Sequence, residues 1–475
     1  MQNTKFINKL KLLDKEELGD FSRFVDSPSY NKNKDAVKLF EYLKAKGNHP
    51  VYGSEKLDRD YVIRKLFPEW KKNPERQMTY LMTILSDLVD RFIVFKEVEC
   101  DEFEHKQLLL KAYKRRQGDK FFDTTIRTFQ RDLDKSPERG INYYFHQYRL
   151  NHERYTHHAT RRMEVGIESL ENTIENLDLF YFGAKLRYAC EIRLRELHLS
   201  DKSELILLDE IMHTIKHPLF EGKPLIQVFS AIVWLYRERG KSIYDQLKIL
   251  IFEHFDEFDK LEQRDIVGFV NNFCILEFNK GQTEYLIEIF EWHEYGLNHN
   301  IWVTEGHIEH AVFDNIVFIA CRLSKFEWVE HFIKAYSKYL REDVGESVKT
   351  MAKCRLAFAQ NKFEQVLELL NGIEFINNMY KIHSEGYILQ CYYELEGYED
   401  AFYSKCEAFS KRCRRDKVIN GELKGLVLNF IRMIQLIHEA KYTGVSKEEL
   451  LKKLKEKPAV FSTWLKKIIE RDIKN

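Results

Sequence analysis

Three related stretches of sequence decide the fold: Leu323-Ser324-Lys325-Phe326-Glu327-Trp328-Val329, Ala359-Gln360-Asn361-Lys362-Phe363-Glu364-Gln365-Val366 and Leu395-Glu396-Gly397-Tyr398-Glu399-Asp400-Ala401. In each of them a short polar turn is followed by an aromatic residue that opens a predicted helix. The three aromatic residues, Phe326, Phe363 and Tyr398, are 37 and 35 residues apart. This spacing is close to the ~34-residue period of tetratricopeptide-type (TPR) helical hairpins.

The spacing also predicts how these hairpins pack. Three residues after each aromatic comes Val329, Val366 or Ala401, and that interval places both side chains on one helix face. From this register we expect Phe363 to be a buried core residue. One hairpin cannot cover its own apolar face, so successive hairpins must pack on each other. The sequence therefore predicts an all-α fold, an elongated right-handed α-solenoid of TPR-like antiparallel helix hairpins.

The predicted helices divide the chain into three parts. Residues 1–136 form a distinct N-terminal helical region, residues 137–445 form the TPR-like solenoid, and residues 446–475 form C-terminal capping helices. In the first part, a long periodic helix is predicted from Pro74 to about Val98. Further along, separate helices are predicted at 160–177, 179–198 and 304–323. No run of alternating apolar and polar residues predicts a strand.

Charge and cysteine usage limit the function classes. The chain has 75 basic and 75 acidic residues, so no overall field draws it to nucleic acid or to an anionic membrane. Its start lacks the apolar region of a secretory signal, and no window approaches ~18 uncharged apolar residues. Eight cysteines without a Cys-x-x-Cys pair are typical of small buried apolar residues. We expect a cytoplasmic protein without membrane insertion.

Several short motifs resemble an uncharacterised family of all-helical bacterial proteins, mainly from Bacteroidetes. They are Glu17-Leu18-Gly19-Asp20-Phe21, Ser27-Pro28-Ser29-Tyr30-Asn31, Lys185-Leu186-Arg187-Tyr188-Ala189-Cys190-Glu191, Asn272-Phe273-Cys274, Asn279-Lys280-Gly281, Asp314-Asn315-Ile316-Val317 and Phe326-Glu327-Trp328-Val329-Glu330-His331-Phe332-Ile333. The resemblance covers most of the chain and implies a cytosolic bacterial origin. It carries no known activity, so it assigns no functional residue. We call the hairpins TPR-like and not TPR hairpins, because Val317 and Leu389 occupy a position in the first helix of each hairpin where TPR sequences usually have a small residue.

Two basic segments are candidate partner-binding surfaces. The first runs from Tyr143 to Arg162 and interleaves aromatic residues with Arg149, Arg154, Arg161 and Arg162, a mixture that suits a nucleic-acid strand. Its tyrosines also recur at helical spacing, which indicates a core stripe. The second is Lys411, Arg412, Arg414, Arg415 and Lys417, at the end of a predicted helix. There the basic residues either offset the helix dipole or bind an acidic ligand.

Signs of chemistry are few. His307, His310 and Asp314 share one face of the predicted helix 304–323 and have side chains that bind divalent metals. The opposite face is apolar, so we interpret the three as a solvated polar face rather than a metal site. The motifs of phosphate-binding loops, nucleophile elbows, zinc proteases and dinucleotide folds are missing. We expect no cofactor, although a site assembled by folding leaves no spacing pattern.

The sequence thus favours a non-enzymatic scaffold or adaptor that presents a helical-repeat surface to a protein or peptide partner. A nucleic-acid-associated protein that uses the two basic segments is the first alternative. An enzyme with a dispersed site is the second, and it would show one deep cleft lined by converging carboxylates or histidines.

Overall fold

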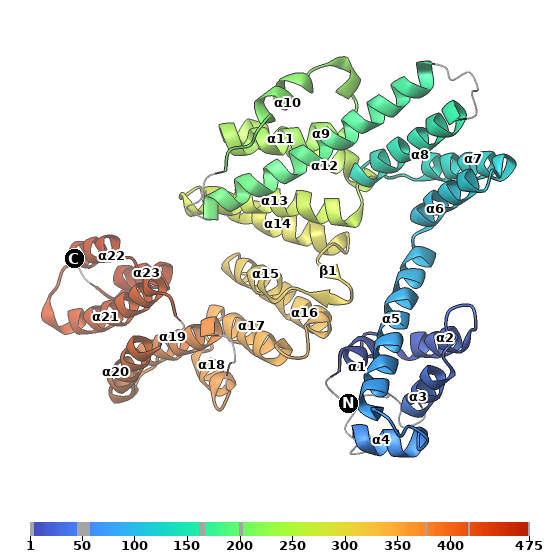
Figure 1. Cartoon of the computed structure of the whole chain (residues 1–475). Helices are drawn as coiled ribbons and strands as arrows, with labels where there is room; N and C mark the ends of the chain where they lie inside the picture. The colour runs from blue at the N-terminus through green and yellow to red at the C-terminus, as the bar shows by residue number, and fades with distance from the viewer. Residues whose placement is uncertain are drawn as a thin grey trace. The chain divides into compact units, whose positions relative to one another are not determined.

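The computed structural model describes residues 4–44, 58–160, 167–198, 203–373, 375, 378–416 and 419–473 (Figure 1). All of their regular secondary structure except one short hairpin is helical, which confirms the all-α prediction. The chain divides into two units, Met1–Pro137 with Ile141–Tyr181 and Glu138–Gly140 with Phe182–Asn475. Within the described ranges, none of the helices combines the length and apolar character that a membrane crossing needs. The three-part division predicted from the sequence stays a prediction.

The first unit is built around the long helix that begins at Pro74, as predicted. Side chains of α1 to α5 form one apolar core, in which the ring of Phe21 lies 5.1 Å from that of Phe40 and 5.4 Å from that of Phe92. The helices of this unit are α1 (Lys5–Leu10), α2 (Lys15–Asp26), α3 (Lys34–Lys44), α4 (Arg59–Leu66), α5 (Pro74–Cys100), α6 (Glu102–Arg115), α7 (Asp119–Lys135), α8 (Ile141–Thr160) and the first part of α9 (Ile167–His198).

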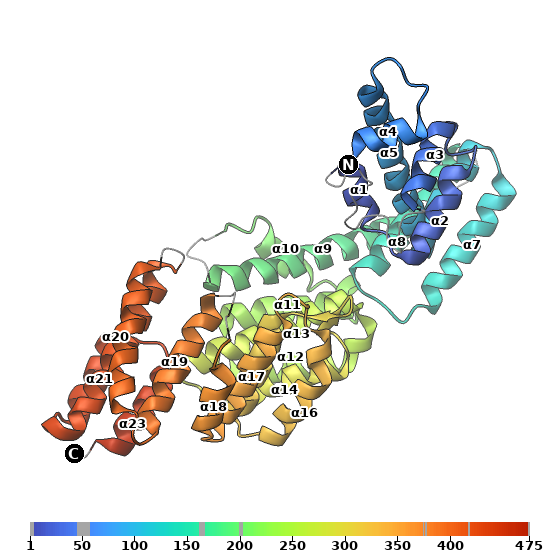
Figure 2. The ribbon, with the colours of Figure 1, turned by 90° about the horizontal axis from the view of Figure 1, so that it is seen from below.

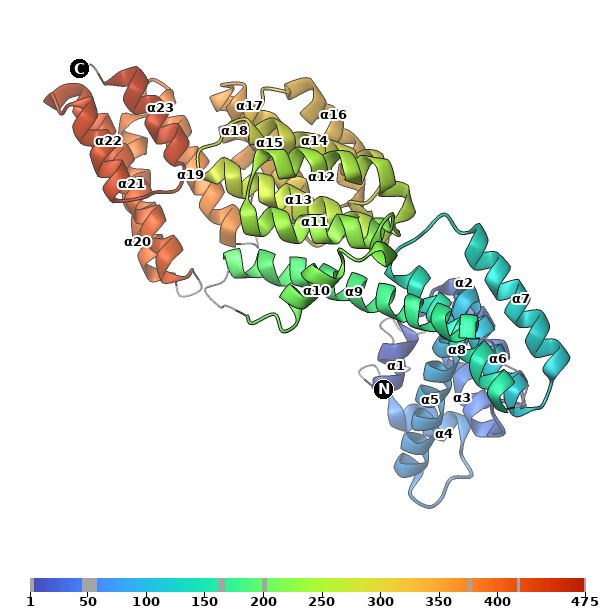
Figure 3. The same cartoon turned by 90° about the horizontal axis from the view of Figure 1, so that it is seen from above.

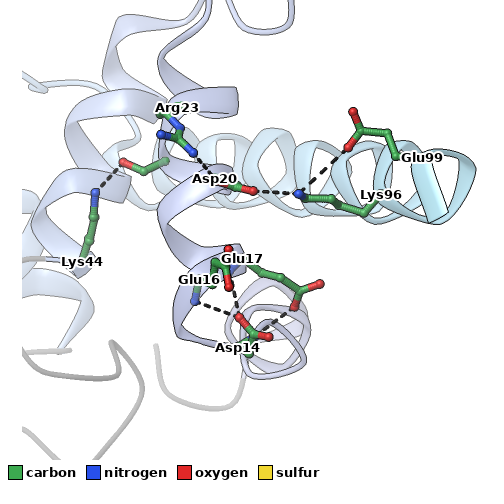
Figure 4. Close-up of polar contacts among 9 residues, drawn as sticks. Asp14, Glu16, Glu17, Asp20, Arg23, Lys44, Lys96 and Glu99 are labelled. Carbon is green, nitrogen blue, oxygen red and sulfur yellow. Dashed lines mark hydrogen bonds and ion pairs between the residues drawn. The ribbon is translucent and has the colours of Figure 1, made fainter.

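Polar contacts fix the start and the outer face of α2 (Figure 4). Asp14 caps the helix by accepting hydrogen bonds of 2.8 Å from the backbone amides of Glu16 and Glu17. One turn further on, Asp20 pairs with Arg23 of its own helix and accepts a hydrogen bond of 2.7 Å from Lys96 of α5. The hydrogen bond from Lys96 lowers the pKa of Asp20. These bonds orient α2 along α5.

In the second unit, helices that follow each other in the chain pack side by side (Figures 2 and 3). From α13 to α21 each helix contacts the next, and α11 also contacts α13, α15 contacts α17, and α17 contacts α19. The helices of this unit are the second part of α9, then α10 (Leu208–Thr214), α11 (Pro224–Glu238), α12 (Lys241–His254), α13 (Lys260–Asn279), α14 (Tyr285–Asn298), α15 (His310–Arg322), α16 (Phe326–Tyr336), α17 (Gly345–Ala359), α18 (Phe363–Leu370), α19 (Asn378–Glu394), α20 (Glu399–Arg415), α21 (Gly421–Thr443), α22 (Lys447–Glu456) and α23 (Ser462–Asp472). Three short 3-10 helices are η2 (Pro218–Phe220), η3 (Phe255–Glu257) and η4 (Ser337–Tyr339).

The turns in the three quoted stretches share a backbone geometry. Ser324 and Asn361 adopt the left-handed conformation, with φ of 57° and 58°. In both turns the next amide donates to the carbonyl five residues earlier, over 3.0 and 2.9 Å, which closes α15 and α17. The following helices begin at Phe326 and Phe363, as predicted. In the third stretch Gly397 has φ of 81° before α20. Each of the three turns therefore places one left-handed residue two positions before its second helix.

The burial predicted at these turns is wrong in one respect. Phe363 and Phe326 are only half-buried, and Tyr398 is 36% exposed. The fully buried side chains are Val329 and Val366, three residues later. An aromatic residue at the first position of a helix lies at the edge of its hairpin, so its ring leans on the preceding helix instead of entering the core.

Two predicted helix boundaries are also wrong. The helices expected at 160–177 and 179–198 are one continuous helix, α9. The helix expected at 304–323 begins only at His310, because a short antiparallel hairpin precedes it. This hairpin pairs β1 (Val303–Thr304) with β2 (His307–Ile308). Its loop residues, Glu305 and Gly306, both have positive φ, as a type I′ hairpin turn requires.

Candidate functional site

A cavity of about 860 Å³ lies inside the second unit, between α15, α17 and α19. The start of α23 and the residues that precede it close a further side. In Figure 1, α15, α17 and α19 follow one another, and α23 lies beside α19. A volume of several hundred Å³ is typical of ligand-binding pockets. The cavity is therefore the candidate functional site.

Helical spacing explains which side chains reach the cavity. On α15, His310, Asp314 and Phe318 follow each other at intervals of four residues and line it from one face. On α19, Tyr380, His383, Tyr387 and Gln390 recur at intervals of three and four and line it from another. Most of the lining surface is apolar, and the polar groups of Asp314, Arg355, Tyr380 and His383 lie close together between α15, α17 and α19.

The wall formed by Phe461 depends on a glycine in α19. A Cβ atom at Gly386 would lie 2.3 Å from Cε2 of Phe461, so the ring fits only because Gly386 has no side chain. Phe461 itself has φ of 55° and immediately precedes α23. Its ring also lies near the rings of His383 and Tyr387, 5.9 Å from each. The ring therefore joins α23 to the polar groups of α19.

Asp314 is a buried carboxylate whose hydrogen bonding is incomplete. Tyr380 donates its hydroxyl to Oδ2 over 2.6 Å, and Arg355 of α17 donates Nη1 to the Asp314 backbone carbonyl over 3.0 Å. The same Nη1 lies 3.6 Å from Oδ1, to which none of the described residues donates a hydrogen bond. Burial raises the pKa of Asp314, and Arg355 and the Tyr380 hydroxyl oppose that rise. One buried oxygen of this carboxylate thus has the nearby Arg355 guanidinium but no hydrogen bond from the described residues.

His383 is held as a neutral hydrogen-bond donor. Its Nδ1 lies 3.3 Å from Nη2 of Arg355. Since a guanidinium only donates, Nδ1 must accept, and the proton of the neutral ring then sits on Nε2. Burial, with Arg355 adding to it, lowers the pKa of His383 to about 4. The ring therefore offers an N–H near neutral pH and is poorly suited to act as a general base.

Positive charge predominates around the cavity. Arg355 lies within it, and Arg322 and Lys467 are exposed side chains of the lining, whereas Asp314 is the one carboxylate among the lining residues. The Arg322 guanidinium lies 5.1 Å from the ring centre of Phe278, which fixes its position. Guanidinium and ammonium groups bind carboxylates and phosphates through charge-assisted hydrogen bonds. The cavity therefore favours an anionic group attached to an apolar body.

Comparison of the chain with family models, with curated proteins and with solved structures gives no match. The resemblance to a bacterial helical family thus stays a prediction.

The first predicted basic segment lies on α8, where two of its arginines make contacts within the first unit. Arg149 donates to both carboxylate oxygens of Glu104, over 2.6 and 3.1 Å. Arg154 donates to Asn151 over 3.2 Å, and burial lowers its pKa. The Arg149 guanidinium, which could bind phosphate, is thus already paired with a carboxylate. Arg161 and Arg162 lie outside the described residues, and the binding role stays a prediction.

The second basic segment lies at the end of α20 in the second unit. Arg412 pairs with the buried Glu385 of α19, and Lys411 pairs with Glu407 one turn earlier. Arg414 and Arg415 are exposed. Lys417 lies outside the described residues. Arg412 thus helps to hold α20 on α19, while binding by this segment stays a prediction.

The predicted arrangement of His307, His310 and Asp314 is wrong. His307 belongs to β2, not to the helix, because the hairpin turn interrupts the predicted segment. Asp314 does not face solvent, since its side chain is 13% exposed and lines the cavity. Throughout the part of the chain that the structure describes, no group of three His, Cys, Asp or Glu side chains could hold a metal ion.

Sequence reasoning singled out His310 and Asp314 but missed Arg355, Tyr380 and His383, which also line the cavity. The sequence does give one sign of Arg355, because this residue interrupts the otherwise apolar helix face that Met351, Ala352, Phe358 and Ala359 form at intervals of three and four residues. A buried arginine needs an acceptor, yet the sequence does not say which carboxylate approaches it. Asp314 lies 41 residues earlier in the chain, and only the packing of α15 on α17 brings the two together.

Proposed function

We propose that the chain is a non-enzymatic adaptor and that its cavity binds a peptide segment of a partner protein. The segment would carry a carboxylate next to a large apolar side chain. The carboxylate contacts Arg322, Lys467 or the His383 N–H, and the apolar side chain packs against Phe318 and Phe461. The observation that carries this proposal is the surplus of hydrogen-bond donors and cations in a mainly apolar cavity.

The arrangement of the helices supports a peptide rather than a small metabolite as the ligand. Successive hairpins in which α15 contacts α17 and α17 contacts α19 suit the predicted TPR-like solenoid, an architecture that offers extended binding surfaces. The right-handed solenoid is part of the proposal. The neutral His383, which donates rather than accepts at Nε2, supports binding over catalysis.

We also propose that the adaptor works in the cytoplasm. Seven of its eight cysteines are buried and all eight are free thiols. Free cysteines that serve as small apolar side chains are usual where the compartment is reducing.

A selection experiment tests the proposed ligand. The full chain is used to select binders from a displayed library of random peptides with free carboxyl termini. We expect enrichment of peptides that place Asp, Glu or the terminal carboxylate beside an aromatic or aliphatic residue. Lys467→Glu should weaken a selected peptide about tenfold or more, because a charge-assisted bond is replaced by repulsion.

Lys466→Glu is the matched control, because Lys466 is also exposed on α23 but does not line the cavity. Its affinity for the selected peptide should stay close to that of the unchanged chain. The proposal fails if no peptide family is enriched. It also fails if Lys467→Glu and Lys466→Glu weaken binding equally.

A further inference from the structure

An apolar stripe runs along the first part of α9, within the first unit. Ile167, Leu170, Ile174 and Leu177 are 74%, 37%, 58% and 39% exposed. They follow each other at intervals of three, four and three residues, which is the spacing of the core positions of a coiled coil. We call these four residues the α9 stripe. It extends over about 15 Å of helix, from the rise of 1.5 Å per residue.

The stripe has an acidic flank on one side. Glu171 and Asp178 lie on the same side of it, at positions that adjoin the seam of a helix pair, and Glu168 lies on that side one position further out. Between Ile167 and Ala184 the sequence contains no lysine or arginine. The positions on the opposite flank, such as Thr173, are uncharged. The α9 surface is therefore apolar in the middle and negative along one edge.

A second copy of this chain does not complement this surface. In an antiparallel pair, Glu171 and Asp178 would face the same acidic positions of the other copy, and like charges there are unfavourable. In a parallel pair they would face the other copy's uncharged flank, including Thr173, and would gain no cation. Neither orientation offsets the negative edge, so self-association is disfavoured.

We propose that the α9 stripe binds a basic amphipathic helix of a partner protein. The partner helix lays its apolar face on Ile167, Leu170, Ile174 and Leu177 and places lysine or arginine side chains beside the acidic flank. An amphipathic helix that docks on an apolar surface is a common mode of protein recognition. The inference is independent of the proposed cavity ligand, since the stripe and the cavity belong to different units.

Two synthetic peptides test the proposal against the full chain. Both carry leucine at the seam positions of three heptads, and the flanking positions are lysine in one peptide and glutamate in the other. Fluorescence anisotropy at low salt should give an affinity about tenfold higher for the lysine peptide, from a few exposed ion pairs. Added salt should reduce that preference.

Variants of the chain separate the apolar from the electrostatic contribution to binding of the lysine peptide. Ile174→Asp should abolish binding of the lysine peptide, because it puts a charge in the middle of the stripe. Glu171→Lys should remove most of the preference for lysine over glutamate. Asn172→Lys is the control, because it adds a cation on the exposed side away from the stripe and should leave the preference in place.

Three results would overturn the proposal. Equal affinity for the two peptides would mean that the stripe is merely apolar. Failure of both peptides to bind would mean that the stripe does not accept a helix. Self-association of the unmodified chain that Ile174→Asp removes would show that a second copy covers it. A charge-reversed Lys467→Glu chain should still bind the lysine peptide, which separates this site from the cavity.

Discussion

Replacing Tyr380 by phenylalanine removes one oxygen atom from the centre of the cavity. In the unchanged chain that hydroxyl donates to Oδ2 of Asp314 over 2.6 Å, and Tyr380 is 3% exposed. The other carboxylate oxygen receives no hydrogen bond from the described residues. Tyr380→Phe therefore leaves a buried carboxylate whose remaining support is the Arg355 guanidinium, 3.6 Å from Oδ1. The loss of a buried hydrogen bond to a charged group costs about 1.5–3 kcal/mol of unfolding free energy.

The loss of unfolding free energy caused by Tyr380→Phe should depend on pH, and the direction of this dependence follows from the pKa of Asp314. Burial already raises the pKa of this carboxyl, and the Tyr380 hydroxyl opposes the rise. Removing the hydroxyl raises the pKa further. A group whose pKa is higher in the folded state than in the unfolded chain destabilises the fold as pH rises through that value. The destabilisation by Tyr380→Phe should therefore be largest at neutral pH and should shrink as acid protonates Asp314.

Tyr236→Phe provides the matched control. It removes the same atom from a buried tyrosine of the same unit, but its hydroxyl donates over 2.7 Å to the neutral backbone carbonyl of Phe269. It should cost about 0.5–1.5 kcal/mol, with little change across the acid range. Urea unfolding followed by circular dichroism, at neutral pH and near pH 4, measures both variants. Equal costs for the two variants, or a cost of Tyr380→Phe that does not vary with pH, would refute the reasoning.

Three further predictions concern burial. Because burial lowers the pKa of His293 from 6.5 to about 4, the neutral ring stabilises the fold above pH 6.5, and about 3 kcal/mol should be lost as pH falls to 4. His293→Leu should remove that part of the acid dependence in urea titrations, and an unchanged pH profile would contradict it. Gly386→Ala should push the Phe461 ring out of place and abolish binding of the library-selected peptide, while helicity by circular dichroism is retained. Full binding by that variant would mean that the ring does not form the wall. Phe363→Ala should cost less than the about 3–5 kcal/mol expected for the fully buried Phe313→Ala, and equal costs in chemical denaturation would place Phe363 in the core.

Local patterns in the sequence were sufficient for most of the helices. Pro74 marks the start of α5, and the polar turns before Phe326 and Phe363 mark the starts of α16 and α18. These features depend on side chains that act on their own backbone within a few residues. The hairpin at Val303–Ile308 escaped detection, because two residues per strand are too few to show alternation.

Local sequence patterns could not predict the candidate site. Asp314 was assigned to a solvated face because its helix neighbours are apolar on the other side only. The polar face that carries Asp314 is buried by α17 and α19. Tyr380, which donates a hydrogen bond to Asp314, lies 66 residues further along the chain. A hydrogen bond across that distance follows from packing, not from a local period. The interruption of an apolar face by Arg355 was the one local sign of a buried polar cluster.

Photochemical cross-linking tests the central claim most directly. The full chain carries benzoylphenylalanine in place of Phe318, which lines the cavity and is 43% exposed, or in place of Tyr442, an 80% exposed aromatic residue on α21 outside the cavity. Each protein is irradiated with the library-selected acidic peptide, and the cross-linked product is identified by mass spectrometry. A cavity that binds the peptide predicts a cross-link from position 318 that excess unlabelled peptide suppresses, and none from position 442. Equal cross-linking from both positions, or none from position 318, would contradict the account.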